Sequence, residues 1–239
     1  MPRSNPAVFP LRDYDLATTI TSGQAFRWRE VDDAWENIIA GRWVRLSVKE
    51  KKLHAQTAEP QKDWQWLTDY LQLEVNLKEI LAAFPKDDPH LAAARKTCRG
   101  LRLLKQDPWE TLAGFICSSN KQIVQIQQII ADLCDCFGEP IHEGWQTFPT
   151  AERLATATEA DLRDCRMGYR AKYLHATATM IAANEIDLPA IATLDYSAAL
   201  AQLQRLPGIG PKVADCILLF AYALSLIHIS EPTRPERIG

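Results

Sequence analysis

The sequence lacks several features that would assign it to a specialised class. None of its six cysteines forms a Cys-x-x-Cys pair, and no cysteine spacing typical of a zinc or iron–sulfur site is present. No apolar run reaches the roughly 18 residues that a membrane helix needs. The first residues, MPRSNPAVFPLRDYD, lack the apolar stretch of a secretory signal. We therefore expect an intracellular protein with no membrane partner, whose thiols are reduced and mostly buried.

The chain also lacks an excess of basic residues. Its net charge is −3 and its pI is about 6.0, which counts against DNA binding, because nucleic-acid-binding chains are often basic. The charge is uneven, however, and residues 91–125 hold six basic side chains against only Asp107 and Glu110. Such a local excess is able to bind phosphate, and it also fits a solvated helix face. The six are Arg95, Lys96, Arg99, Arg102, Lys105 and Lys121.

With 239 residues, of which 47% are apolar and 24% charged, the chain has the composition of an ordinary globular protein. Residues 6–57 predict an antiparallel sheet of four or five strands, because short β-prone runs alternate with turn residues. Residues 15–20 and 24–28 are the first two expected strands. Residues 35–39, 43–48 and 53–57 are the others.

After Pro60 the pattern becomes helical. Asp107 is expected to cap a helix that Pro108 opens, with Glu110 completing a capping box. An apolar stripe predicts the next helix and consists of Ile123, Ile126, Ile129, Ile130, Leu133 and Phe137. Further helices are expected over residues 170–184, 197–206 and 211–222.

The strongest local motif is LPGIGPKVAD, residues 206–215. It predicts a helix, a tight turn, and a second helix opened by Pro211. Gly208 and Gly210 permit backbone conformations closed to other residues, and successive N–H groups beside a helix N-terminus bind phosphate. This is the helix-hairpin-helix pattern, which holds the DNA backbone independently of base sequence. An ordinary glycine turn between helices is the structural alternative.

Lys212 is the candidate nucleophile. It lies one residue inside the second helix of this motif, and apolar residues follow it. A lysine that is partly desolvated, near the positive end of a helix dipole, loses its proton more readily. A neutral amine is able to attack an electrophilic carbon and form a Schiff base. A lysine that only contacts phosphate fits the same position.

Four segments closely resemble the 8-oxoguanine DNA glycosylase/lyase family. LPGIGPKVADCILLFAY resembles its catalytic hairpin, and residues 22–28, SGQAFRW, resemble its SGQ(A/S)FRW strand. Residues 101–120, LRLLKQDPWETLAGFICSSN, and residues 168–173, GYRAKY, resemble two more of its blocks. The likeness extends from about residue 5 to about residue 223, with the motifs in the family's order.

The resemblance implies a chemical role for three residues. Lys212 attacks C1′ of the damaged nucleotide, expels the base and then cuts the strand by β-elimination. Gly23 offers its carbonyl to the N7–H that 8-oxoguanine has and guanine lacks, and Cys216 lines the base pocket. Read without the family, Gly23 is a strand glycine at a bulge, and Cys216 is an inert core thiol.

The resemblance also implies how the duplex is held. Asn120 fills the gap left by the flipped base, Tyr169 wedges into the stack, and Arg170 reads the opposite cytosine. Read without the family, Asn120 is a helix C-cap and Tyr169 a buried ring. Gln125 stands where the family often has an arginine that checks for cytosine, so we expect looser discrimination of the opposite base. We interpret Asp215 as a structural partner and not as the catalytic carboxylate.

The C-terminal residues depart from the family. Residues 224–234, LSLIHISEPTR, match the translation of a transposase-type sequencing-library adapter, so residues 224–239 are expected to be a non-native tail on a truncated chain. The resemblance places a catalytic aspartate at the position of Glu231, where no matching motif occurs. A genuine, divergent tail is the alternative, and in that case a DNA-binding remnant is the better interpretation.

Together these observations predict an α+β fold. Residues 1–95 form an antiparallel sheet domain with flanking helices, and residues 96–223 a helical domain with the helix-hairpin-helix at about 197–223. The intact protein is predicted to be a monomer, associated with DNA in the cell, that removes 8-oxoguanine opposite cytosine from double-stranded DNA and nicks the abasic strand. It needs no redox cofactor, and the hairpin is suited to a monovalent cation held by main-chain carbonyls. The chain as written is expected to lack the acid partner of Lys212.

Three alternatives have distinguishing features. A glycosylase for alkylated bases shares the sheet and the hairpin but lacks the lysine. An endonuclease III-like enzyme has the lysine but no sheet domain. A non-catalytic DNA-binding module uses the hairpin alone and forms no covalent intermediate.

Overall fold

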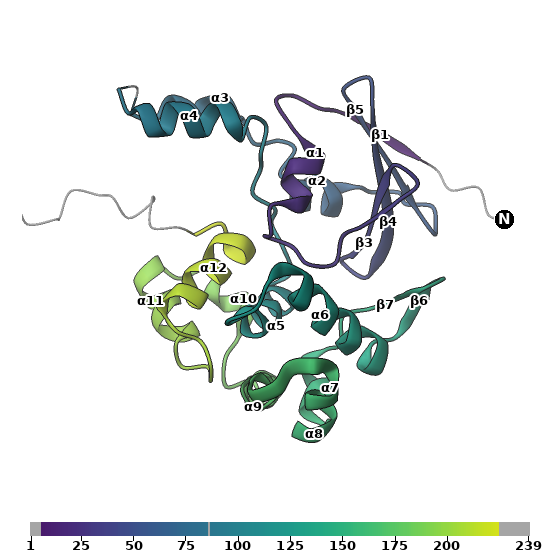
Figure 1. The fold of residues 1–239 in the computed structure, drawn as a ribbon, viewed down its shortest axis with the longest axis vertical. Coiled ribbons are helices and arrows are strands. Elements are labelled where there is room, and N and C mark those ends of the chain that lie inside the picture. Colours follow the sequence, from purple (N-terminus) through teal and green to yellow (C-terminus); the bar gives the residue numbers. More distant parts are fainter. Residues whose placement is uncertain (1–5, 86, 225–239) are drawn as a thin grey trace, which may run out of the picture. The chain divides into compact units, whose positions relative to one another are not determined.

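The structure, a computed structural model, describes residues 6–85 and 87–224 (Figure 1). The chain divides into two compact units. Unit 1 comprises Met1–Lys105 and Gln122–Pro149, and unit 2 comprises Gln106–Lys121 and Thr150–Gly239. The predicted domain boundary near residue 95 stays a prediction. All of the predicted non-native tail except Leu224 lies outside the described residues.

Unit 1 contains the predicted antiparallel sheet, which has five strands in the order β1-β5-β4-β3-β2 (Figure 1). The three central strands occupy the expected segments, residues 35–39, 43–48 and 53–57, to within one residue at each end. On β4, Val44 and Leu46 are fully buried while their neighbours are partly exposed, as expected for a strand with one face in the core. The strands are β1 (Ala7–Pro10), β2 (Arg29–Val31), β3 (Ala34–Ile39), β4 (Arg42–Lys49) and β5 (Lys52–Thr57).

Two of the predicted strands are wrong. Residues 15–20 lie mostly in helix α1 (Leu16–Thr21), capped by Asp15, whose carboxylate accepts a hydrogen bond from the Thr18 N–H at 2.9 Å. The β-branched residues suggested a strand, but Leu16, Thr19 and Ile20 are buried at helical spacing, and burial outweighs local propensity. Residues 24–28 pair with no strand in the described part of the chain.

The core of unit 1 lies where α1 and α2 (Gln65–Leu71) pack on one face of the sheet (Figure 1). Leu16 of α1 and Leu67 of α2 join Leu46 and Leu53 of the sheet in one apolar cluster. Two further helices, α3 (Leu77–Ala82) and α4 (Pro89–Thr97), contain no buried residue. They contribute little to this core.

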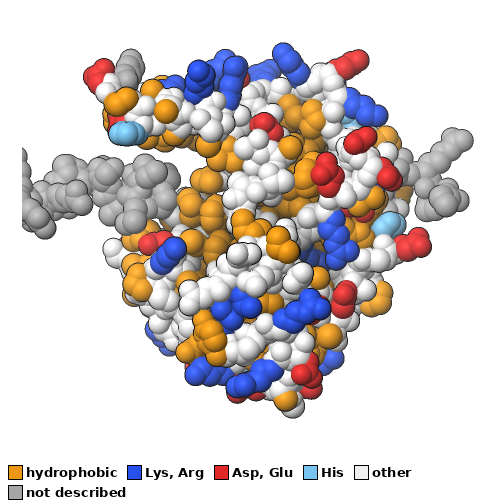
Figure 2. Space-filling model, in the orientation of Figure 1, with side chains coloured by type: hydrophobic (Ala, Val, Ile, Leu, Met, Phe, Trp, Pro, Cys, Tyr) orange, Lys and Arg blue, Asp and Glu red, His pale blue; other side chains and the backbone are white. Residues whose placement is uncertain are grey.

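The basic segment is only partly a surface patch. Arg95, Lys96 and Arg99 are exposed on or next to α4, and Figure 2 shows blue side chains gathered over this helix. Arg102, in contrast, is buried, and its guanidinium donates to the carbonyl oxygens of Arg12, Asp13 and Val75 at 2.8, 3.3 and 2.7 Å. Its inclusion in the patch was wrong, because a buried guanidinium bonded to main-chain carbonyls is a structural anchor.

Helix α6 (Ile123–Phe137) and the hairpin of β6 (Pro140–His142) and β7 (Trp145–Gln146) complete unit 1. Most of the predicted apolar stripe of α6 is buried. Ile123, at its first turn, is instead 46% exposed. Gln125 is the third helical residue and closes a capping box, accepting from the Gln122 N–H at 3.2 Å.

Unit 2 is helical and is centred on α5 (Pro108–Ser118), which α9 (Ala171–Ala182) and α12 (Pro211–Tyr222) contact. The predicted cap is confirmed, because the Asp107 carboxylate accepts from the Glu110 N–H at 2.8 Å. Phe115 of α5 stacks on Phe220 of α12 with 5.7 Å between ring centroids. The remaining elements are α7 (Ala151–Ala155), α8 (Glu159–Leu162), the short turns Arg163–Met167 and Gly168–Arg170, α10 (Leu188–Ile191) and α11 (Tyr196–Leu203).

Within the described ranges, no helix has the length and apolarity to cross a membrane, and no group of three or more His, Cys, Asp or Glu side chains is arranged to hold a metal ion. All six cysteines are free thiols. Cys134 is buried and Cys136 exposed, so the two thiols face different directions on α6.

Candidate active site

The predicted helix, turn and helix are present in unit 2 as α11, residues 204–210 and α12. Gly208 has φ +82°, a conformation that costs an L-residue about 1–2 kcal/mol. A Cβ there would lie 2.9 Å from the Cβ of Tyr173. Gly210 caps α12 with φ −90°, and a Cβ there would meet nothing within 4 Å. The turn therefore requires glycine at position 208, whereas position 210 has the space and the backbone conformation for other residues as well.

The turn is held on α9 and open to solvent on its other side. Thr177 of α9 donates a hydrogen bond from Oγ1 to the carbonyl oxygen of Pro207 at 3.2 Å, and Tyr173 packs under Gly208. Gly208 and Gly210 are both exposed. Their main chain beside the N-terminus of α12 is thus accessible to an anion, as a phosphate-binding hairpin requires.

Lys212 is exposed, so the predicted partial desolvation is not found. The reason is its helical position. Ala214, Ile217 and Leu218 form the buried face of α12, and at 100° per residue Lys212 lies opposite to them. Cys216, four residues on, lies on the same side as Lys212, so the amine and the thiol share the outward face of the helix.

On α12, Lys212 and Asp215 both interact electrostatically with Cys216. Burial, and less strongly the Asp215 carboxylate, raise the pKa of the half-buried Cys216 thiol, while the Lys212 charge lowers it. The hydroxyl of Tyr196 on α11 donates a hydrogen bond to Asp215 Oδ1. Asp215 is therefore engaged across the hairpin, which supports its interpretation as a structural partner.

Asn120, Tyr169 and Arg170 lie together in unit 2. Asn120 is exposed just after α5, with φ +53°. Arg170 is buried, and its guanidinium donates from Nε to the Ser119 carbonyl oxygen at 2.8 Å and from Nη1 to that of Met167 at 3.3 Å. It thereby supports the turn that presents Asn120, and its predicted contact with cytosine stays a prediction.

Tyr169 is not a buried ring, which is the interpretation that the sequence allows when the family resemblance is set aside. It is 48% exposed, and the Arg170 guanidinium carbon lies 4.4 Å from the centroid of its ring. Tyr169 also meets Tyr173 edge to face, with 6.3 Å between ring centroids. Because Tyr173 contacts Gly208, the GYRAKY segment and the hairpin turn form one packed surface.

Gly23 lies in unit 1, in a turn after α1 and not in a strand, with φ +83°. The adjacent Gln24 is buried and anchors this turn. Its Nε2 donates to the carbonyl oxygens of Thr19 at 3.0 Å and Arg102 at 2.9 Å, and its Oε1 accepts from the Leu104 N–H at 2.8 Å. The backbone that carries the Gly23 carbonyl is thus held by side-chain hydrogen bonds on one side.

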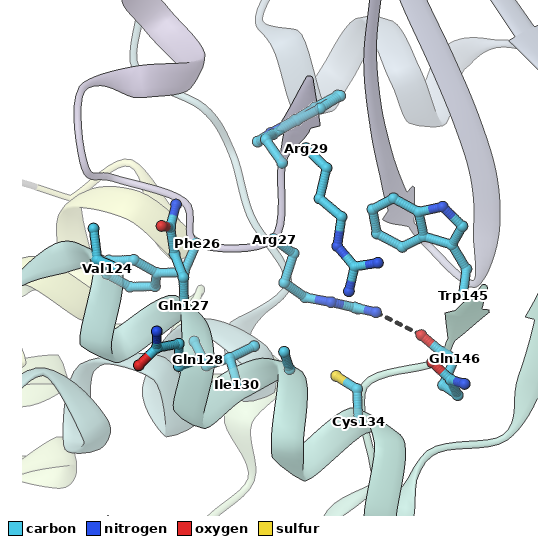
Figure 3. Close-up of a pocket in the computed structure, with 12 residues that line it drawn as sticks. Phe26, Arg27, Arg29, Val124, Gln127, Gln128, Ile130, Cys134, Trp145 and Gln146 are labelled. Carbon is cyan, nitrogen blue, oxygen red and sulfur yellow. Dashed lines mark hydrogen bonds between the residues drawn. The ribbon is translucent and has the colours of Figure 1, made fainter. Parts of the chain in front are cut away.

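Unit 1 also holds a cavity of about 260 Å³ that the sequence did not predict, although Phe26, Arg27 and Trp28 of the SGQAFRW segment line it. Segment 26–29, α6 and β7 line it (Figure 3). Arg27 donates to the Gln146 carbonyl oxygen at 2.5 Å, and the Arg29 guanidinium lies 4.3 Å from the centroid of the Trp145 ring. These contacts join residues more than 100 positions apart in sequence, so local patterns could not reveal them.

The chain matches known proteins over most of its length. The family model for the N-terminal domain of 8-oxoguanine DNA glycosylase matches residues 8–112, and that for the HhH-GPD superfamily of base excision DNA repair proteins matches residues 113–227. N-glycosylase/DNA lyase OGG1 of Arabidopsis thaliana is 33% identical, over 90% of this chain and 64% of the plant protein. The probable N-glycosylase/DNA lyase of Methanothermobacter thermautotrophicus is 30% identical, over 89% of this chain and 78% of the archaeal protein.

Among solved structures, the 8-oxoguanine glycosylase/lyase of Clostridium acetobutylicum in its apo-form superposes with a TM-score of 0.85 at 28% identity, over 92% of this chain and 80% of that one. Its complex with double-stranded DNA containing cytosine opposite 8-oxoguanine gives a TM-score of 0.83 at 27% identity, over 91% and 79%. The present chain spans less than two thirds of the Arabidopsis relative. On the matches to both family models and to these relatives, the chain belongs to the 8-oxoguanine DNA glycosylase family within the HhH-GPD superfamily of base excision DNA repair proteins.

Proposed function

We propose that the chain removes 8-oxoguanine from double-stranded DNA and cleaves the resulting abasic strand through a lysine Schiff base. The observation that carries this is the hairpin of unit 2, where Lys212 is exposed immediately after a glycine turn whose main chain is open to phosphate. The relatives named N-glycosylase/DNA lyase support both steps.

The two reactions proposed for Lys212, base excision and strand cleavage, require no redox cofactor. Once Nζ of Lys212 has lost a proton, it attacks C1′ of the flipped nucleotide, the C1′–N9 bond breaks, and the base leaves with the bonding electrons and takes up a proton. Ring opening gives the Schiff base, loss of a C2′ proton expels the 3′ phosphate, and water then releases the lysine. Exposure on the outward face of α12 makes the amine accessible for this attack.

Recognition is assigned to residues that the family motifs supply. The Gly23 carbonyl accepts the N7–H of 8-oxoguanine, and guanine, whose N7 is an acceptor, offers no such donor. Cys216 lines the base pocket as a neutral thiol, since its pKa is raised. Asn120 and Tyr169, both exposed, contact the opened duplex, and the main chain of Gly208 and Gly210 binds a backbone phosphate. The cytosine contact expected of Arg170 requires its buried guanidinium to leave the carbonyl oxygens of Ser119 and Met167.

The proposed partner is duplex DNA with oxidised guanine, bound by a monomer, and the proposed location is the cell's DNA. A monovalent cation at the hairpin belongs to the same proposal. The carbonyl oxygens of Leu206 and Pro207 already accept from the Ile209 N–H and Thr177 Oγ1. Each retains a second lone pair, so the turn is able to contribute ligands, although no step of the reaction depends on the cation.

Borohydride trapping on a duplex with 8-oxoguanine opposite cytosine tests the proposal. We expect the full chain to form a covalent adduct and Lys212→Gln to form none. Lys78→Gln, an exposed lysine of unit 1, is the control and should trap normally. A chain that binds an abasic-analogue duplex but never traps would instead be a DNA-binding module. Equal excision of 3-methyladenine would favour an alkylated-base glycosylase.

A further inference from the structure

Ile123 is an apolar side chain that is 46% exposed at the first turn of α6. It nevertheless has a defined contact within unit 1. An ideal Cβ built on Gly23 would lie 2.8 Å from Ile123 Cδ1 and 3.7 Å from Cγ1. The δ-methyl group therefore occupies the space that a side chain at position 23 would need.

The contact adds a second restraint to the Gly23 turn. On one side, the buried Gln24 side chain ties the turn to Thr19, Arg102 and Leu104 by hydrogen bonds of 2.8–3.0 Å. On the side of the missing Cβ, Ile123 covers Gly23. Gly23 has φ +83°, and glycine adopts more backbone conformations than any other residue. The direction of its carbonyl group therefore depends on these neighbouring side chains.

We propose that Ile123 is a positioning residue for lesion recognition, whose δ-methyl group packs on Gly23 and holds the carbonyl that reads N7–H. This rests on the proposed function, because it presumes that Gly23 distinguishes 8-oxoguanine from guanine. Ile123 acts through Gly23, and the role requires no contact of its own with the base. Preorganised acceptors lose effect when they shift by a fraction of an ångström.

Val124 is a matched control on the same helix. It is also aliphatic, is 61% exposed, and lines the separate cavity of Figure 3 beside Phe26. Truncating it removes similar apolar surface without touching Gly23. Because both residues are largely exposed, neither truncation should unfold the chain, and melting temperatures of the two variants verify this.

The experiment compares base excision with trapping on a preformed abasic site, which requires Lys212 but no base recognition. We expect Ile123→Ala to lower single-turnover excision of 8-oxoguanine opposite cytosine on the order of tenfold and to leave abasic trapping within about twofold. Ile123→Val, which removes only the contacting δ-methyl group, should give an intermediate loss. Val124→Ala should leave both rates unchanged.

A double-mutant cycle tests the contact itself. Gly23→Ala places a Cβ against Ile123, and Ile123→Ala removes the obstructing methyl group, so the double variant should lose less excision than the product of the two single losses. The proposal is overturned if Ile123→Ala behaves like Val124→Ala, if it lowers trapping in parallel with excision, or if the losses multiply. If the unchanged chain neither excises nor traps, the proposed function itself fails.

Discussion

The Tyr196 hydroxyl donates a hydrogen bond to the carboxylate of Asp215 and so connects α11 to α12 across the hairpin turn. Asp215 lies three residues after Lys212, on the exposed side of α12. The contact therefore fixes the two helices whose junction forms the turn, and it keeps the carboxylate nearest to Lys212 in sequence engaged with a neutral donor.

Removing this hydrogen bond should weaken unit 2. We expect Tyr196→Phe to lower the free energy of unfolding by about 1 kcal/mol, measured by urea unfolding at pH 8. Tyr169→Phe, whose ring is half-exposed, serves as the control and should change it by less than about 0.5 kcal/mol. Equal stabilities of the two variants would show that the Tyr196 hydroxyl contributes nothing.

The same contact predicts a pH dependence. Desolvation, followed by the hydrogen bond to Asp215 and its charge, raises the pKa of Tyr196 from 10.0 to about 12. Below pH 10 the hydroxyl is protonated in both folded and unfolded chains, so its contribution to stability is complete. Between pH 10 and 12 the unfolded chain loses the proton first, and the free energy of unfolding falls. Urea unfolding of Tyr196→Phe over this range should show a smaller fall, and an identical fall would contradict the assignment.

The two glycines of the hairpin should respond differently to alanine. Gly208→Ala combines a positive φ with a Cβ 2.9 Å from Tyr173, so we expect a loss of about 2–4 kcal/mol in stability. Gly210→Ala has space for its Cβ and an ordinary φ, and it should cost less than about 1 kcal/mol. Denaturant unfolding of both variants checks this, and similar losses would mean that Tyr173 does not crowd position 208.

Gln125 offers a test of opposite-base discrimination. Its side chain accepts from the Gln122 N–H at the start of α6 and carries no positive charge. We expect Gln125→Arg to raise the ratio of excision opposite cytosine to excision opposite adenine by about tenfold, since one bidentate arginine contact discriminates by about 1–3 kcal/mol. Gln125→Ala loses the same cap without adding charge and should leave the ratio unchanged. If the excision ratio changed equally in Gln125→Arg and Gln125→Ala, the cause would be loss of the hydrogen bond to the Gln122 N–H and not the added charge.

Thiol reactivity should follow burial. Desolvation raises the pKa of the fully buried Cys117 to about 12, with the Arg170 charge opposing the shift. Because the thiolate is the reactive form, iodoacetamide at pH 8 should modify the exposed Cys98 and Cys136 first and Cys117 only after unfolding. Peptide mass spectrometry over time measures the order, and early modification of Cys117 would contradict its burial.

Much of the fold could be predicted from short-range patterns. Asp107 before Pro108 identified the start of α5, and the β-prone run of residues 43–48 identified β4, because capping and strand propensity depend on neighbours in sequence. Residues 15–20 show the limit of this reasoning. Their β-branched composition suggested a strand, yet the core made a helix the better way to bury Leu16 and Ile20.

Of the candidate site, the sequence by itself determined the residue types and their spacing: the hairpin turn, the lysine one residue inside α12, and the family to which these belong. Only the tertiary structure decided that Lys212 is exposed, that Arg102 is buried under main-chain carbonyls, and that Ile123 covers Gly23. The physical reason is the sequence separation over which each interaction acts. Turn and cap preferences act over a few residues, whereas burial, hydrogen bonding of a side chain to distant carbonyls, and packing against a missing Cβ depend on segments about 100 positions apart that meet only in the folded chain.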